Sequence, residues 1–205
     1  MPEPSERQGG LDQPAKRFRI EGYAIISSDG MIADASGAFP SALIFEADKS
    51  FYARELDRVD AVVQGRHSHE GQPNSGRRRR LVLTRRVATI APDPDHPKSF
   101  LWNPAGASLE EAGAALGLAS GAMGVVGGTE VFDLFLGLGA GFDAFHLSRA
   151  AKVKLPGGAP VFSQILSGRS PEDVLAQHGL QPGPTQVLDE ANALTLVSWA
   201  RKAPA

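Results

Sequence analysis

Short apolar runs separated by turn-forming residues recur along most of this chain. The first, residues 18–26, alternates loosely at its start and then becomes continuously apolar, which is typical of a strand that enters a core. We predict further strands at residues 61–63, 81–84, 99–102, 124–126, 144–148 and 161–162. The chain then closes with a predicted hairpin, in which residues 185–188 pair with residues 194–199.

Three segments between these runs have features of helices. Apolar positions in residues 44–56 recur at helical spacing, with acids early and Arg54 late, which suits the helix dipole. Ser108 and Glu111 form the sequence pattern of a capping box, so a second helix is expected to begin there. A third helix is predicted over residues 129–136.

Strands that alternate with helices predict an α/β fold with a mixed, mostly parallel sheet flanked by helices on both faces. The closing hairpin would add antiparallel strands at one edge. A chain of 205 residues fits one domain with a full-sized core. Residues 1–17 are mostly polar and rich in Pro, Glu, Ser, Gln and Gly, so we expect a disordered tail followed by a single domain over residues 18–205.

The composition narrows the function classes. A net charge of −2 gives no electrostatic reason to expect nucleic acid or an anionic membrane as a partner. The absence of cysteine excludes disulfides and thiolate metal sites, and the histidines are not spaced for a metal site. No apolar run approaches the ~18 residues of a membrane span, and the N-terminus lacks the apolar core of a signal peptide. These features predict a cytoplasmic protein.

Residues suited to binding phosphate follow three of the predicted strands. They are Gly65, Arg66, His67 and Ser68 after the second strand, Thr84, Arg85 and Arg86 after the third, and Gly127, Gly128, Thr129 and Glu130 after the fifth. Each segment alone is equally a tight turn or a polar loop end. Because parallel strands end at one edge of a sheet, where ligands bind, the three together predict a phosphate-rich ligand there. The first strand is not followed by G-x-G-x-x-G, which argues against a Rossmann dehydrogenase.

The order of these segments resembles the dihydrofolate reductase superfamily, and within it the C-terminal reductase domain of the riboflavin-pathway deaminase-reductase. The resemblance covers about residues 20–200 and rests on residues 26–33, 60–66, 83–85, 127–129, 145–148 and 155–162. The zinc deaminase signature needs cysteine, so only the reductase half is in question. The basic residue that often precedes the Ser-x-Asp-Gly segment in riboflavin-pathway members is absent here.

The resemblance implies an oxidoreductase that uses NADPH. Gly65, Arg66, His67 and Ser68 match a phosphate-contacting segment, and Thr84 and Arg85 match the loop beside the adenosine 2′-phosphate. Gly127, Gly128, Thr129 and Glu130 match the diglycine turn and helix start under the pyrophosphate. Ser28, Asp29 and Gly30 match the segment near the nicotinamide and the substrate. The run of four arginines at residues 77–80 is either a second phosphate cradle or a solvated basic loop.

Two acids are candidates for the catalytic group. Asp29 lies in the segment nearest the nicotinamide, and Asp48 lies roughly where folate-reducing members keep a pterin-binding acid. The expected reaction is hydride transfer to a small heterocycle, of pyrimidine or ribosylamino type. Reduction of a pterin or a small carbonyl compound, and nucleotide binding without catalysis, remain alternatives. By the same resemblance, residues 194–199 could pair across a homodimer.

Overall fold

The computed structural model describes residues 18–66, 68, 75–139 and 141–202. The predicted tail, residues 1–17, and His67 lie outside the described residues. The helices are α1 (Glu46–Leu56), α2 (Leu109–Ala115), α3 (Thr129–Gly137) and α4 (Pro171–Gln177). The strands are β1 (Phe18–Ser27), β2 (Met31–Ala33), β3 (Ala61–Gly65), β4 (Arg80–Leu83), β5 (Ile90–Pro92), β6 (Ser99–Trp102), β7 (Gly121–Val125), β8 (Ala144–Ala150), β9 (Ala159–Pro160), β10 (Leu180–Asp189) and β11 (Leu194–Arg201).

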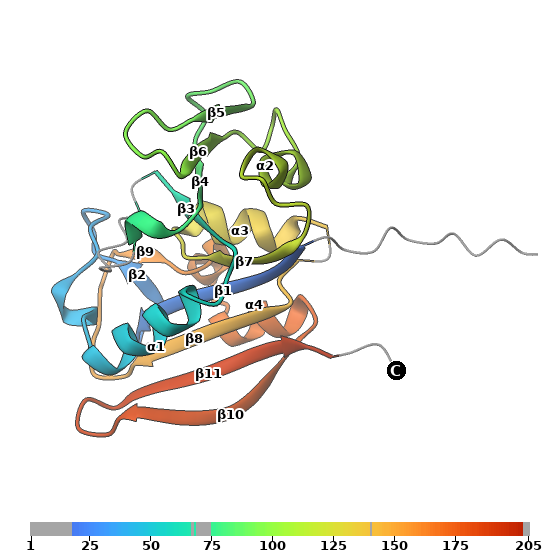
Figure 1. The fold of residues 1–205 in the computed structure, drawn as a ribbon. Helices are drawn as coiled ribbons and strands as arrows, with labels where there is room; N and C mark the ends of the chain where they lie inside the picture. The colour runs from blue at the N-terminus through green and yellow to red at the C-terminus, as the bar shows by residue number, and fades with distance from the viewer. Residues whose placement is uncertain (1–17, 67, 69–74, 140, 203–205) are drawn as a thin grey trace, which may run out of the picture.

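A sheet of nine strands forms the centre of the described molecule, in the order β10-β11-β8-β1-β7-β3-β4-β6-β5 (Figure 1). The pairs from β8 through β6 are parallel, whereas β5, β11 and β10 run antiparallel to their neighbours. A second small sheet pairs β2 with β9. The predicted mixed, mostly parallel sheet with a C-terminal antiparallel hairpin is therefore confirmed.

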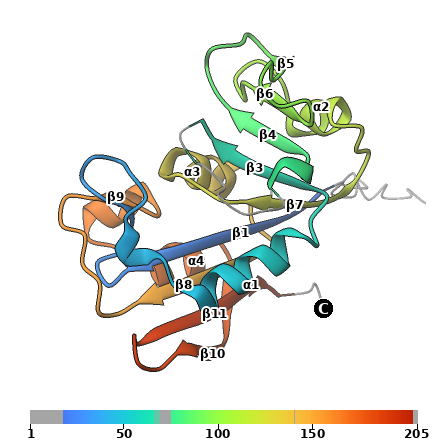
Figure 2. The same cartoon turned by 60° about the vertical axis from the view of Figure 1, so that its left-hand side comes forward.

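Helices cover both faces of this sheet. α1 packs on one face, where Leu56 joins Tyr23 and Val62 in a buried cluster. α2, α3 and α4 contribute to the main core on the other face (Figure 2). In that core Phe132 contacts Phe145 edge to face at 5.3 Å between ring centroids. The apolar runs of the parallel strands are thus buried on both sides, as expected for such sheets.

The central strand β1 comes very close to the ring of Phe145. A Cβ atom at Gly22 would lie 2.2 Å from Phe145 Cδ2, so only glycine fits at this position while the ring keeps its place. Phe145 is fully buried and pairs in register with Gly22. The missing side chain on β1 therefore makes the space that the aromatic core fills.

The C-terminal hairpin is longer than predicted. β11 lies between β8 and β10, so residues 194–199 already pair on both sides within one chain. Pairing across a homodimer would have to use the outer edge of β10, where Pro182 and Pro184 have no N–H to donate. The homodimer stays a prediction.

Three local predictions differ from the structure. The strand expected at residues 161–162 is wrong: β9 ends at Pro160, although Val161 and Phe162 are fully buried. α4 was not predicted, although Ser170 and Asp173 form its capping box. α1 begins at Glu46 rather than at residue 44. Among the described residues, every helix is too short or too polar to cross a membrane.

Candidate functional site

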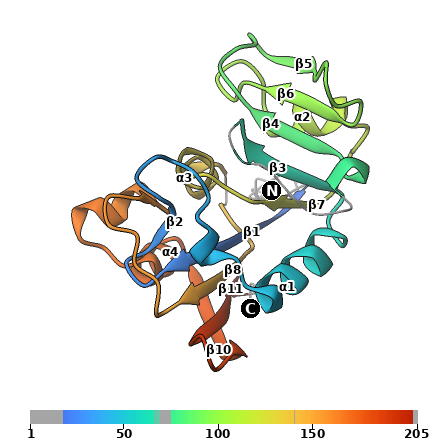
Figure 3. The same cartoon turned by 90° about the vertical axis from the view of Figure 1, so that its left-hand side faces the viewer.

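A cavity of about 1640 Å³ opens where the parallel strands end. Figure 3 looks toward that edge of the sheet, with α3 seen end-on between β2 and the strands β3 and β4. Residues that follow β3, β4 and β7 line one part of the cavity. Side chains of α1, β1 and β8 line another part. We call these the nucleotide half and the substrate half, after the roles that the sequence resemblance implies for Arg85 and for Asp48.

The nucleotide half brings together the three phosphate-type segments that the sequence indicated. The predicted residues that line the cavity here are Gly65, Arg66, Ser68, Thr84, Arg85, Gly127, Gly128, Thr129 and Glu130, together with Arg86. They meet because β7, β3 and β4 are consecutive parallel neighbours in the sheet. The roles of these residues stay predictions, but their convergence on one cavity is a property of the structure.

The diglycine turn shapes the start of α3. The peptide bond between Gly127 and Gly128 is cis, and Gly127 has φ +106°, a conformation that favours glycine. The Gly65 N–H donates to the Gly127 carbonyl at 2.8 Å, which joins the ends of β3 and β7. Gly128 caps α3 without a side chain, and a Cβ there would meet nothing within 4 Å. Backbone donors at the positive end of the helix thus border open space in the cavity.

Positive and negative side chains face each other across the nucleotide half. Arg85, at the end of β4, lies 3.4 Å from Glu130, in the first turn of α3. Both side chains are more than four-fifths exposed, at 86% and 88%. An ion pair this exposed contributes little to stability, so both groups are available to a bound ligand. Arg86 adds a second exposed cation on the same wall.

The substrate half is organised around Asp48. Its side chain faces β8, where the hydroxyl of the buried Ser148 favours the ionised carboxylate. Burial raises the pKa of Asp48 above its ordinary value, and the Ser148 hydroxyl only partly opposes this effect. Phe51 and Tyr52 follow at helical spacing and line the cavity with it. This half therefore offers one carboxyl group, with a raised proton affinity, among aromatic walls.

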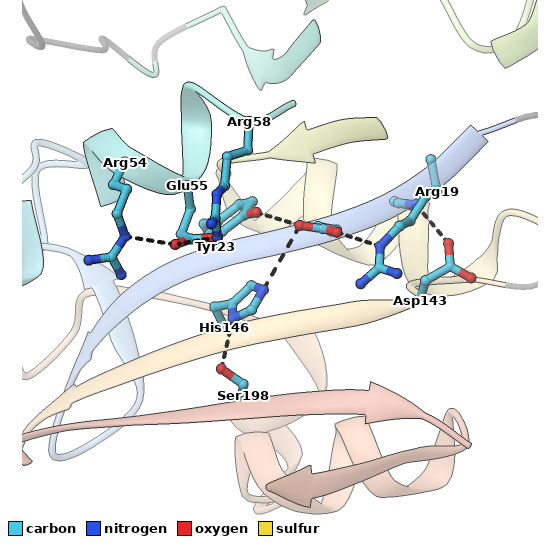
Figure 4. A network of polar contacts seen from close by, with 10 residues as sticks. Arg19, Tyr23, Arg54, Glu55, Arg58, Asp143, His146 and Ser198 are labelled. Atoms are coloured by element: carbon cyan, nitrogen blue, oxygen red, sulfur yellow. Dashed lines mark hydrogen bonds and ion pairs between the residues drawn. The ribbon is translucent and has the colours of Figure 1, made fainter. Parts of the chain in front are cut away.

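The floor of the substrate half is polar as well as aromatic. Tyr23 of β1 and His146 of β8 (Figure 4) are register partners and both line the cavity. Their rings stack with 4.8 Å between centroids and 15° between planes. Sequence reasoning gave Tyr23 no role in a site. It placed His146 and Ser148 in the segment 145–148 that carries the resemblance, and it otherwise considered His146 only as a metal ligand. Polar residues alternating with buried apolar ones in β8, at positions 146 and 148, were the available signal.

The segment that contains Asp29 occupies a different place. Ser28, Asp29 and Gly30 form the turn between β1 and β2 and do not line the described cavity. The Asp29 carboxylate accepts hydrogen bonds from the Ser27 hydroxyl, at 2.5 Å, and from the Leu155 N–H, at 3.1 Å. Burial acts to raise the pKa of Asp29, but these hydrogen bonds hold it below its ordinary value. A catalytic role for Asp29 stays a prediction, and the geometry favours Asp48.

The four arginines at residues 77–80 also lie outside the cavity lining. Arg78 donates to Asp57, at 2.6 Å, and to the Ala53 carbonyl, so it ties the end of α1 to this segment. Arg80 is buried and donates to the Ser75 carbonyl. Arg77 and Arg79 line a separate hollow of about 400 Å³ with Lys98. None of the four is placed to cradle a phosphate in the main cavity.

Comparison with solved structures identifies the fold. Neither a scan against family models nor a search of curated proteins gave a match. A protein assigned to riboflavin biosynthesis from Shewanella sp. PV-4 superposes with a TM-score of 0.62 at 21% identity, over 90% of this chain and 99% of that one. Dihydrofolate reductase from Enterococcus faecalis, complexed with NADP(H) and RAB-propyl, gives 0.59 at 17% identity, over 90% and 97%.

This chain has the dihydrofolate-reductase-like fold. A bifunctional diaminohydroxyphosphoribosylaminopyrimidine deaminase and 5-amino-6-(5-phosphoribosylamino)uracil reductase from Thermotoga maritima also matches, with a TM-score of 0.60 at 18% identity. The match covers 91% of this chain but 57% of that one. The expected dihydrofolate-reductase-like fold is confirmed. Sequence identities this low show a shared fold and do not show a shared activity.

Proposed function

We propose that this protein is an NADPH-dependent reductase that delivers a hydride to a small nitrogen heterocycle. The observation that carries the proposal is the joining of two chemically different halves in one cavity. One half has glycines, exposed arginines and a helix start without a side-chain cap, and the other has a half-buried carboxyl group. A dinucleotide cofactor beside a small polar substrate needs both.

The nucleotide half suits NADPH. The open space at Gly128 admits a pyrophosphate close to the backbone donors at the start of α3. Thr84, Arg85 and Arg86 would hold the 2′-phosphate, because exposed guanidinium groups form charge-assisted hydrogen bonds with phosphate. NADPH, when bound, would supply the hydride. The protein is left to orient the acceptor and to provide one proton for each turnover.

Asp48 is the residue we propose for the substrate. In its protonated form it can donate to a ring nitrogen, and in its ionised form it can accept from an N–H or amino group. Its raised pKa increases the share of protonated acid, so it can release a proton as the hydride arrives. The Ser148 hydroxyl favours the ionised form of the carboxyl group and so limits the rise of its pKa. Phe51 and Tyr52 would flank a planar ring.

The substrate class depends on the charges around Asp48. A phosphorylated ribosylamino pyrimidine, as named for the Thermotoga neighbour, would need a cation for its phosphate. Among the described residues of α1, β1 and β8 that line the cavity, Lys49 is the one lysine or arginine, whereas the nucleotide half has Arg66, Arg85 and Arg86. This arrangement favours an unphosphorylated heterocycle, such as a pterin, over a sugar phosphate. A small carbonyl compound remains a second candidate, because Asp48 could also protonate an alkoxide.

Nucleotide titration tests the proposal directly. Quenching or enhancement of reduced-nicotinamide fluorescence should show micromolar binding of NADPH and weaker binding of NADH. Arg85→Ala should weaken NADPH binding about tenfold or more, the loss expected for a charge-assisted hydrogen bond, and should leave NADH almost unaffected. Arg58→Ala is a matched control, because Arg58 is an exposed arginine just beyond the end of α1, paired with Glu55.

The outcomes separate the alternatives. NADPH binding followed by its oxidation with a pyrimidine, pterin or carbonyl acceptor supports a reductase and identifies the substrate class. NADPH binding without oxidation by any acceptor would favour a nucleotide-binding domain that lacks catalysis. If neither nucleotide binds, the proposed function is wrong.

A further inference from the structure

Residues 153–163, which follow β8 and include β9, have no task in the function proposed above. We call them the β9 segment. The resemblance rests partly on residues 155–162, but sequence reasoning assigned them no role. Ala159 lines the cavity, and so do Ile32 and Ala33 of the partner strand β2. The β2–β9 pair is therefore one wall of the candidate site.

The β9 segment lies very close to β2. Ala33 and Ala159 are register partners in this antiparallel pair. A Cβ atom at Gly158 would lie 2.3 Å from the Ala33 carbonyl oxygen, so a side chain there would force the two strands apart. The Val161 N–H donates to the Gly30 carbonyl at 3.0 Å, just before β2 begins. The two strands are thus held together, and a shift of the β9 segment would shift β2 as well.

The far end of the β9 segment is attached to α3. The Thr129 hydroxyl donates to the Pro160 carbonyl, and the Asp133 carboxylate accepts from the Ser163 N–H at 3.2 Å. Thr129 is the first residue of α3 and also lines the nucleotide half. The β9 segment therefore contacts the same helix start whose backbone donors border the cavity.

The near end of the β9 segment is attached to the turn between β1 and β2. Both oxygens of the Asp29 carboxylate accept from the Leu155 N–H, at 3.1 and 3.2 Å. The N–H and the hydroxyl of Ser28 donate to the Val153 carbonyl, at 2.7 and 2.8 Å. The fully buried Ser27 donates its hydroxyl to Asp29 at 2.5 Å, which ties the carboxylate to the end of β1. Because a charged acceptor makes stronger hydrogen bonds than a neutral one, we expect Asp29 to make the strongest of these attachments.

We propose that Asp29 is a positioning residue, which holds the β9 segment to the β1–β2 turn and so keeps the β2–β9 pair in place beside the start of α3. Asp29 does not line the cavity, and its carboxylate oxygens accept from Ser27 and Leu155 instead. Any effect on a ligand therefore passes through the β2–β9 pair. A loosened pair would disturb the space beside Gly128 and Thr129, so the affinity for nucleotide should fall; this consequence rests on the proposed function.

Hydrogen exchange of single backbone amides, followed by NMR in deuterated water, tests the attachment without any ligand. Asp29→Ala removes the acceptor of the Leu155 N–H. The informative probe is the Val161 N–H, which Asp29 does not touch and which belongs to a fully buried residue. We expect its exchange to become about ten- to a hundredfold faster, the loss expected for a hydrogen bond to a charged group. The Val126 N–H, bonded to the Val63 carbonyl in the central sheet, reports the whole molecule and should change less.

Two further variants make this experiment specific. Asp29→Asn keeps one acceptor oxygen, so exchange at Val161 should fall between the wild type and Asp29→Ala, and this milder change serves if Asp29→Ala folds poorly. Asp93→Ala is the matched control: Asp93 is also half-buried and its carboxylate holds a turn, by accepting from the Asp95 N–H at 3.0 Å, after β5. It should leave Val161 unchanged. Faster exchange at Leu155 alone, or equal acceleration at Val161 and Val126, would overturn the proposal.

A second measurement separates positioning from catalysis, and it rests on the proposed function. Asp29→Asn should raise the NADPH dissociation constant about three- to tenfold, while the pH profile of kcat keeps its midpoints, because the contacts of Asp48 are unchanged. The opposite split, a lower kcat with an unchanged dissociation constant, would mean that Asp29 acts directly on the reaction and would contradict the positioning role. The exchange experiment needs neither cofactor nor substrate, so it still judges the attachment if NADPH does not bind.

Discussion

The substitution Asp48→Asn keeps the shape of the side chain and removes its ability to exchange a proton. The amide can still bond to the Ser148 hydroxyl, so the pocket should keep its geometry. General-acid assistance contributes roughly 10²–10⁴ in rate, so we expect kcat to fall by about this factor, or about 3–5 kcal/mol in the barrier. NADPH affinity should change by less than about twofold, because the nucleotide half is built by other strands.

The same substitution lowers turnover but is not expected to lower stability. Burial raises the pKa of Asp48 in the folded state above the ordinary value of 3.8 kept by the unfolded chain. The folded protein therefore holds this proton when the unfolded chain has lost it, and the wild type loses stability as pH rises between these two pKa values. Each pH unit of that interval removes about 1.4 kcal/mol. Asp48→Asn escapes this loss, so at neutral pH its free energy of unfolding should equal or exceed the wild-type value.

Stopped-flow or steady-state kinetics measure the first effect, and urea denaturation at acidic and neutral pH measures the second. Glu46→Gln removes an exposed acid from the same helix and should change neither quantity. Turnover that survives in Asp48→Asn would refute the assigned role. A variant that is less stable than the wild type at neutral pH would refute the reasoning about burial.

Three further changes test other parts of the structure. Ser148→Ala removes the hydroxyl that opposes burial at Asp48, so the high-pH limb of kcat should move upward; a downward shift would contradict the Ser148–Asp48 contact. Glu130→Gln removes the carboxylate beside Arg85 at the start of α3 and should tighten NADPH binding about two- to fivefold in a fluorescence titration, more than it tightens NADH. Gly22→Ala places a methyl group against Phe145 and should cost about 1–3 kcal/mol of unfolding free energy in urea, while a neutral result would mean that the ring can move freely.

The architecture of the sheet was largely predictable, because it depends on a local signal. Parallel strands buried on both faces appear in the sequence as short apolar runs, and the run at residues 99–102 coincides with β6. The hairpin was predicted too short because Pro182 and Pro184 indicate a turn. In the structure they fit into β10 as an exposed edge strand, where a missing N–H is tolerated.

The candidate site was predictable only in part, for a physical reason. Phosphate-type residues cluster in sequence after strand ends, so the nucleotide half could be anticipated residue by residue. The substrate half is assembled from single side chains on α1, β1 and β8, which are distant in sequence. Nothing local to Ser148 or Tyr23 shows that they will line the same cavity as Asp48 of α1. Asp29 shows the converse, since its neighbours in sequence suggested a site but its hydrogen bonds hold a turn.

The order of the strands has a consequence for how such a protein can change over time. β1 and β8 bear the sheet residues around Asp48, whereas β3, β4 and the turn after β7 carry the nucleotide residues on the far side of β1. If the proposed function is right, replacements on α1 or β8 would therefore alter which molecule is accepted without disturbing the residues proposed for the cofactor. Under that function, a single scaffold would acquire new substrates by small steps while its source of reducing power stayed the same.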